Sequence, residues 1–172
     1  GFSPPIAEMF GFGMTVHTAV SKLHEVFLDA APASEDARTI AREVFHLKHV
    51  PPSKDPEVRP GPYERARERA EDIIETYART FSRDFAHRRQ VEVRFEIPVR
   101  QAVIAGSIDL ILHKDEAGNI IDASVIDFKT LEGGEEPEGN PDIQWTELAL
   151  QVQLYAKAAR DVLGEDTRTG AV

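Results

Sequence analysis

The sequence predicts a mixed α/β or α+β fold in which helices flank a small antiparallel sheet. Apolar residues recur at three- and four-residue steps in the first half of the chain and again near its end, which indicates amphipathic helices. Between residues 90 and 130 the period changes to two, and turn-forming residues separate the apolar runs, as is typical of strands. The order of helices, a three-strand meander and a final helix implies a layered structure.

Three helices are expected before the sheet. Ser34 is placed to cap the second helix, and Pro62 suits the first turn of the third. The segment "VPPSKDPEVRPGP" between these two helices contains too many prolines for a regular element, so we expect a loop there. The expected helices cover residues 14–28, 34–47 and 62–89.

The sheet is expected to begin at "QVEVRFEIPV", where apolar and charged residues alternate. "DEAGN" is expected to form the turn between the second and third strands, and Gly164 is expected to close a final helix. The last residues, ending in "TGAV", would only open a further strand. The expected strands cover residues 90–99, 101–113 and 124–130, and the final helix covers 143–164.

Composition excludes several classes of protein. The chain of 172 residues contains no cysteine, which excludes disulfides, thiol nucleophiles and iron–sulfur clusters, and fits a cytoplasmic location. No apolar run approaches the roughly 18 residues of a membrane span, so no membrane partner is expected. We expect residues 1–172 to form a single domain, which the glycine at position 1 suggests is part of a larger protein.

A net charge of −10 argues against tight binding of nucleic acid, because phosphate contacts depend on clustered Lys and Arg. Arginines do gather between residues 65 and 100, which leaves a local basic surface open. A charged helix face exposed to solvent explains the same pattern at least as well.

Two apolar strands each carry an aspartate, Asp109 and Asp127, and Lys129 follows two residues after the second. Residues i and i+2 of a strand share a face, so Asp127 and Lys129 are expected to point into one space, and pairing across the turn can add Asp109. Adjacent carboxylates favour a bound cation, and their oxygens suit Mg²⁺ or Mn²⁺. These residues would support metal-assisted phosphodiester hydrolysis. For an isolated D-x-K triplet, a structural salt bridge is the more frequent explanation.

Four other side chains could belong to this site. His17 could supply an imidazole ligand, although a lone histidine more often serves helix packing. Gln151 and Tyr155 are spaced i, i+4 and would project from one helix face toward a phosphate or base, or simply flank the core. Glu96 could join the carboxylates, but its alternation with Val and Phe favours a solvated face.

Taken in order, these motifs resemble the RecB-type branch of the PD-(D/E)xK nuclease superfamily, as found in the C-terminal nuclease domain of UvrD-like superfamily 1 helicases of the RecB and AddA groups. The similarity covers about residues 13–163. The motifs that carry it are "GMTVHTAV", "GSIDLIL", "VIDFKT" and "QVQLY".

The resemblance implies a restriction-endonuclease-like core, a mixed central sheet with an antiparallel meander flanked by helices. It also implies metal-dependent cleavage of DNA within a repair or recombination helicase–nuclease, with a helicase motor as partner in the same chain or complex. The implied catalytic residues are Asp109, Asp127 and Lys129; the implied metal ligands are His17, Asp109, Asp127 and the Phe128 backbone carbonyl; Gln151 and Tyr155 would place the substrate.

The sequence departs from many relatives in lacking the four cysteines of an iron–sulfur cluster, so no such cluster is expected. Its second acid is Asp rather than Glu, which RecB-type members accept, and the last strand is missing or only begun. A catalytically inactive nuclease fold that guides DNA or docks a protein is the alternative. A metal-dependent phosphatase or nucleotide hydrolase that uses the same carboxylates is a further rival. No P-loop or G-x-G-x-x-G motif is present, so nucleotide binding by those routes has no support.

Overall fold

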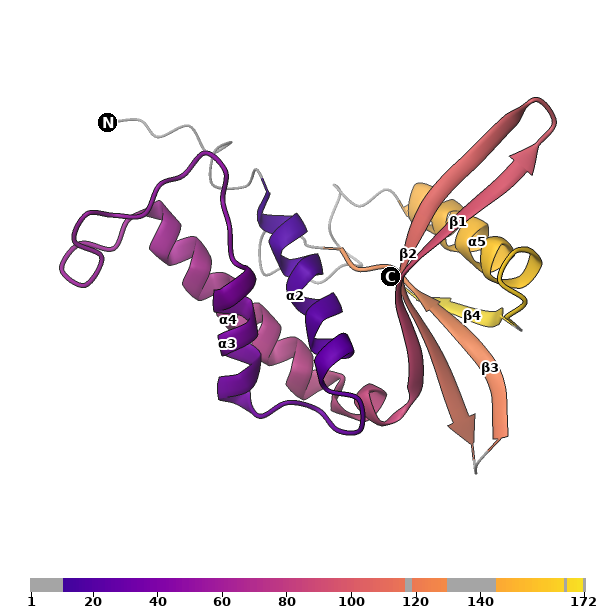
Figure 1. The fold of residues 1–172 in the computed structure, drawn as a ribbon, viewed down its shortest axis with the longest axis horizontal. Helices are drawn as coiled ribbons and strands as arrows, with labels where there is room; N and C mark the ends of the chain where they lie inside the picture. Colours follow the sequence, from indigo (N-terminus) through magenta and orange to yellow (C-terminus); the bar gives the residue numbers. More distant parts are fainter. Residues whose placement is uncertain (1–10, 117–118, 130–144, 166, 172) are drawn as a thin grey trace. The chain divides into compact units, whose positions relative to one another are not determined.

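The structure is a computed structural model that describes residues 11–116, 119–129, 145–165 and 167–171 (Figure 1). The chain divides into two compact units, residues 1–86 (the N-terminal unit) and 87–172 (the C-terminal unit). The predicted "LEGGEEPEGNPD" loop lies outside the described residues.

Helices make up the described part of the N-terminal unit. Its elements are α2 (Phe12–Val26), α3 (Ser34–Val44), α4 (Pro62–Thr80) and the 3₁₀ helix η1 (Ser82–Ala86). Pro62 opens α4 as predicted, and the Glu64 side chain caps the start of the helix by accepting the backbone N–H of Gly61 at 2.7 Å. Ser34 is the first residue of α3, and Ala33 takes the cap position that the sequence assigned to Ser34.

The prediction of one helix over residues 62–89 is wrong. α4 ends at Thr80, and the chain tightens into η1, which buries Phe85 completely. The Phe85 ring stacks on His24 of α2, with 4.4 Å between ring centroids and 10° between ring planes. The Nε2 atom of His24 also lies 2.6 Å from the hydroxyl oxygen of Tyr77. The end of α4 thus coincides with contacts to a helix distant in sequence.

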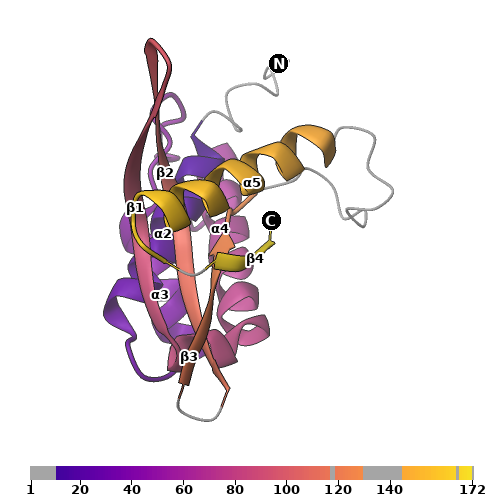
Figure 2. The same ribbon diagram turned by 90° about the vertical axis from the view of Figure 1, so that its right-hand side faces the viewer.

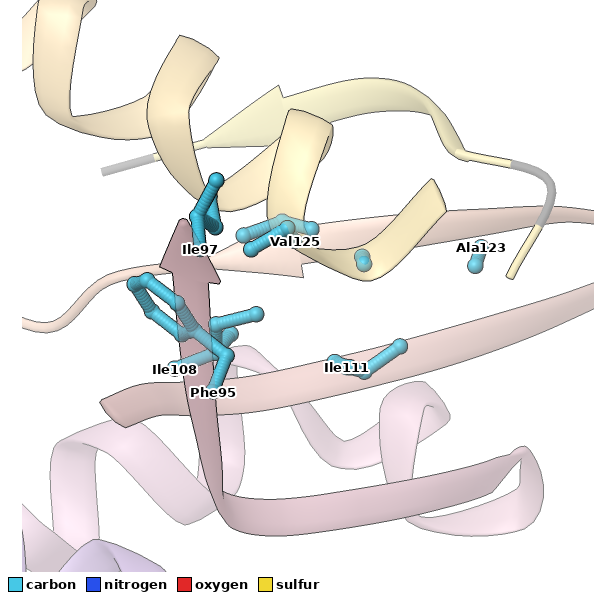
Figure 3. Packing of buried hydrophobic residues seen from close by; sticks show 8 residues of the cluster. Phe95, Ile97, Ile108, Ile111, Ala123 and Val125 are labelled. Carbon is cyan, nitrogen blue, oxygen red and sulfur yellow. The ribbon is translucent and has the colours of Figure 1, made fainter. Parts of the chain in front are cut away.

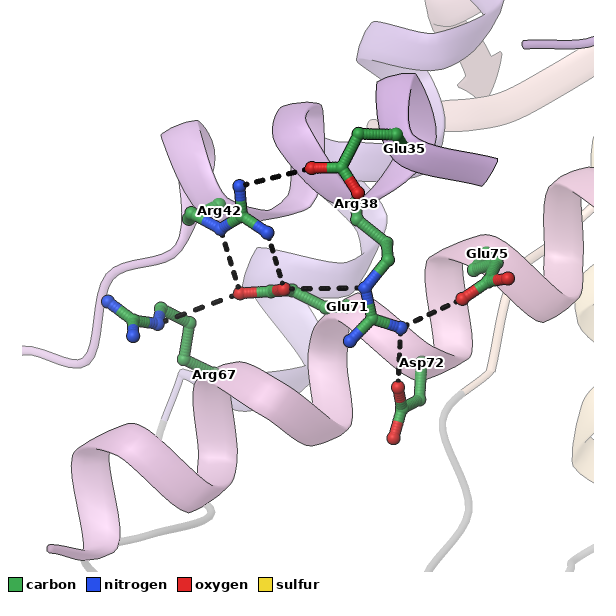
Figure 4. A network of polar contacts seen from close by, with 7 residues as sticks. All are labelled: Glu35, Arg38, Arg42, Arg67, Glu71, Asp72 and Glu75. Atoms are coloured by element: carbon green, nitrogen blue, oxygen red, sulfur yellow. Dashed lines mark hydrogen bonds and ion pairs between the residues drawn. The ribbon is translucent and has the colours of Figure 1, made fainter. Parts of the chain in front are cut away.

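Arginines and carboxylates connect α3 to α4 (Figure 4). Arg42 donates two hydrogen bonds to Glu71, from Nε at 3.2 Å and from Nη2 at 2.9 Å. Arg38 donates to Asp72 at 2.7 Å and to Glu75 at 2.8 Å. The side chain of Glu71 is 8% exposed and is also 3.6 Å from Arg67 Nε. Every buried charge in this group has an opposite partner.

A four-stranded sheet and one helix form the described part of the C-terminal unit. The elements are β1 (Arg88–Val99), β2 (Ala102–Glu116), β3 (Asn119–Ile126), α5 (Trp145–Asp161) and β4 (Thr167–Ala171). The strand order is β1-β2-β3-β4; the first three strands pair antiparallel and β4 lies parallel to β3 (Figures 1 and 2). The mixed sheet beside helices confirms the predicted fold class. The last residues do open a further strand, as expected: β4 pairs with β3, so this strand is not missing.

α5 packs on one face of this sheet through small and apolar side chains (Figure 3). Ala158 and Ala159 are fully buried, and their small side chains let the helix lie close to the strands. Gly164 has φ of +73°, which ends the helical run as predicted, and the Glu165 N–H returns to the Ala159 carbonyl at 2.9 Å. The buried members of this cluster are Phe95, Ile97, Ile108, Ile111, Ala123, Val125, Ala158 and Ala159.

Candidate active site at the sheet and helix α5

The two predicted aspartates lie at the end of the pairing between β2 and β3. Leu110 of β2 pairs with Ile126, the last residue of β3, so Asp109 precedes and Asp127 follows this final pair, and the Phe128 N–H is 2.7 Å from Asp109 Oδ2. Asp109 is 9% exposed and Asp127 is 3% exposed. Two neighbouring carboxylates removed from water repel each other unless positive charge lies between them.

Asp109 also explains why the third strand is shorter than predicted. β3 ends at Ile126 instead of continuing to residue 130. The backbone N–H of Phe128 donates to Asp109 Oδ2 at 2.7 Å, so a side chain takes the donor that would otherwise extend the ladder. The segment with Asp127, Phe128 and Lys129 therefore leaves the sheet while remaining tied to β2.

Lys129 provides the positive charge nearest to Asp127. Its Nζ lies 2.6 Å from Asp127 Oδ2, and the lysine side chain is 34% exposed while that of Asp127 is 3% exposed. The contact is an ion pair, and Oδ2 makes no hydrogen bond with a described residue. A partly exposed lysine thus pairs with a buried carboxylate.

Helix α5 contributes the other two predicted side chains. Gln151 donates from Nε2 to Tyr155 Oη at 2.7 Å and to Asp127 Oδ1 at 3.2 Å. Tyr155 and Gln151 are one turn apart and share the helix face that carries Ala158 and Ala159 toward the sheet. The packing of α5 therefore brings the glutamine amide to the aspartate at the end of β3.

Two predicted residues are not joined to this group by the structure. His17 lies half-buried on α2 of the N-terminal unit, and its role as a ligand stays a prediction. Glu96 is exposed on β1 opposite Ala105, and its exposure favours the solvated-face interpretation. Phe95, to which the sequence analysis gave no site role, contacts the Tyr155 ring at 5.6 Å between centroids.

The oxygen donors of the site fit a hard divalent cation. Asp109 and Asp127 are carboxylates, and the buried Asp127 Oδ2 already faces one cation, the Lys129 ammonium, without a hydrogen bond within the described residues. Among those residues, no three His, Asp or Glu side chains gather closely enough to hold a metal. The two carboxylates and the Phe128 carbonyl, which the family resemblance implies as donors, stay the predicted ligands from the C-terminal unit.

A sequence profile of the PD-(D/E)XK nuclease superfamily matches residues 3–172. The chain belongs to this superfamily, whose members are generally hydrolytic nucleases that use divalent metal ions. No curated protein matches the chain. Within the described residues, no helix has both the length and the apolar character needed to cross a membrane. The match spans both units, and a single domain over residues 1–172 stays a prediction.

Proposed function

We propose that this chain hydrolyses DNA phosphodiester bonds with a divalent metal, as the exonuclease-type domain of a RecB-type helicase–nuclease in DNA repair or recombination. The observation that carries the proposal is the position of Asp109 and Asp127 at the end of the pairing between β2 and β3, with Lys129 Nζ 2.6 Å from the second carboxylate. Such a buried like-charge pair costs stability, which favours a functional role over a structural one.

Each residue has a distinct part in this mechanism. When bound, Mg²⁺ or Mn²⁺ supplies charge neutralisation at the phosphate and lowers the pKa of a coordinated water. Asp109 and Asp127 would hold the cation together with the Phe128 carbonyl, and Gln151 fixes the orientation of Asp127 through Oδ1. The Lys129 ammonium, which lies beside Asp127 on a partly exposed side chain, would stabilise charge on the phosphoryl oxygens or orient the attacking water.

A helicase motor as partner reconciles this activity with the acidic chain. With a net charge of −10, tight independent binding of DNA is not expected. A motor in the same chain or complex would deliver the DNA strand at high effective concentration, which substitutes for affinity. The proposed location is the cytoplasm, where DNA and the motor would be accessible.

The test is cleavage of end-labelled single- and double-stranded DNA by the 172-residue chain in Mn²⁺, Mg²⁺ or EDTA. We expect metal-dependent oligonucleotide or mononucleotide products that disappear in Lys129→Ala and in EDTA. Release of phosphate from small esters without DNA products would indicate the phosphatase instead. Full cleavage by Lys129→Ala would contradict the mechanism.

An inactive nuclease fold that guides DNA or docks a protein is the second candidate. The ion pair between Lys129 and Asp127 supports it, because the lysine could simply neutralise a retired carboxylate. Isothermal titration with Mn²⁺ separates the two candidates. Absence of both metal binding and cleavage would favour the inactive module.

A further inference from the structure

Gly106 of β2 makes room for an aromatic ring from the neighbouring strand. Phe95 of β1 pairs directly with Gly106, and a Cβ at position 106 would lie only 2.7 Å from Phe95 Cζ and 2.9 Å from Cε1. A separation below 3.0 Å is not tolerated, so any side chain here would displace the ring. The glycine is therefore required for the observed position of Phe95, which is 4% exposed (Figure 3).

The Phe95 ring in turn packs against the residues that hold Asp127. Its plane meets that of Tyr155 at 70°, with centroids 5.6 Å apart, in an edge-to-face contact. The Tyr155 hydroxyl accepts from Gln151 Nε2, and the same nitrogen donates to Asp127 Oδ1. Packing and hydrogen bonds thus link Phe95 to the aspartate without a break.

We propose that Phe95, in the space that Gly106 leaves, is a positioning residue that orients the Gln151 amide and through it the Asp127 carboxylate. An amide nitrogen carries two hydrogens, and here each has its own acceptor, so a shift of the Tyr155 ring must turn the amide or break one bond. Asp127 Oδ1 is held by the amide while Oδ2 faces Lys129. The catalytic part of this proposal rests on the proposed nuclease function.

Two opposite changes test the role of Phe95. Phe95→Leu removes the ring contact, whereas Gly106→Ala keeps the ring and pushes it away. We expect both to lower kcat for DNA cleavage by about 10-fold or more, with KM little changed, because small displacements of a reacting group are costly. Ile97→Ala is the control, since Ile97 lies on the same strand and in the same buried cluster but makes no ring contact with Tyr155 because it is aliphatic.

A second readout does not depend on cleavage. The side-chain NH₂ resonances of Gln151 in a ¹⁵N-labelled chain, identified by their loss in Gln151→Glu, should shift in Phe95→Leu and Gly106→Ala and stay in place in Ile97→Ala. Unmoved resonances in the first two variants, or equal kcat losses in all three, would overturn the proposal. If the unsubstituted chain cleaves no DNA, the nuclease proposal fails, while the resonances still decide whether Phe95 positions Gln151.

Discussion

The two units handle buried charge in opposite ways. In the N-terminal unit, Glu71 is nearly buried but has three arginines within 4 Å, and these lie on the surface of α3 and α4. In the C-terminal unit, Asp109 and Asp127 are buried as neighbours of the same sign, and Lys129 is the cation paired with the second. Both arrangements remove carboxylates from water. Only the first surrounds the buried carboxylate with enough positive charge to stabilise it without a ligand.

This difference separates a structural ion network from a candidate catalytic site. Opposite charges that pair with each other leave no unpaired charge to bind a ligand. Removing one of them should therefore lower the stability of the fold. Like charges held together are destabilising by themselves, and the loss of one should affect function more than stability. Substitutions in the two places should therefore give opposite results.

The largest expected effect is on cleavage by Asp127→Asn. The amide keeps an oxygen for the Gln151 hydrogen bond but removes the charge needed by a cation and by Lys129. We expect cleavage to fall by about 10²–10³-fold, the scale for removing one electrostatic group from an active site. The melting temperature should not fall, because repulsion from Asp109 is relieved.

Asp161→Asn is the matched control for this change. Asp161 also pairs with a lysine, Lys157, but lies exposed on α5 near the end of the helix. Hydrogen bonds from Lys157 and the neighbouring Arg160 hold the pKa of Asp161 below its usual value. Cleavage by this variant should equal that of the unsubstituted chain, and an equal loss in both variants would contradict a specific role for Asp127.

Much of the fold could be predicted from the sequence because hydrophobic period is a local property. The spacing of apolar residues changes from helical to strand-like before residue 90, and the structure changes from helix to strand at the same place. β1 lies where apolar and charged residues alternate. Element ends were predicted less well, since long-range contacts set them. The stacking of Phe85 on His24 accompanies the early end of α4, and the Asp109 carboxylate ends the ladder of β3.

The candidate site was predictable to a similar extent. The turn between the second and third strands predicts that Asp109 and Asp127 meet, and helical spacing predicts that Gln151 and Tyr155 share a face. The proposed positioning role of Phe95 could not be predicted from the sequence, because its alternation with charged residues indicates only that it lies in the core. The sequence did contain a signal, namely an aromatic residue that pairs with a glycine across β1 and β2. Recognising this pair requires knowing which residues form the turn between the two strands, because the turn sets the register.

The next effect in size is a loss of stability in Glu71→Gln. Glutamine cannot pair with the arginines that surround this position, and two hydrogen bonds from Arg42 lose their charged acceptor. We expect the free energy of unfolding of α3 and α4 to fall by about 1.5–3 kcal/mol, the scale of charged hydrogen bonds. Hydrogen exchange of the amides in both helices measures it, with the β2 amides as internal reference.

Cleavage per folded molecule should stay unchanged in Glu71→Gln. The matched control is Glu35→Gln, because Glu35 contacts the same Arg42 at 3.7 Å but is 77% exposed. Its effect on stability should be within about 1 kcal/mol, as for exposed ion pairs. Equal losses at the two positions would show that burial of Glu71 does not matter.

The smallest effect is confined to acid and concerns Glu75. Hydrogen bonds from Arg38 lower the pKa of this carboxyl below its ordinary value of 4.5. A group whose pKa is lower in the folded state stabilises the fold above the unfolded pKa, and this contribution is lost as the pH falls through the folded value. The difference in melting temperature between the unsubstituted chain and Glu75→Gln should thus be constant above pH 4.5 and shrink below it.

Glu68→Gln, on the same helix but outside the network of Figure 4, is the control. A difference for Glu75→Gln that grew in acid would mean that Arg38 does not favour the charged form, and the N-terminal unit would lose its contrast with the aspartate pair.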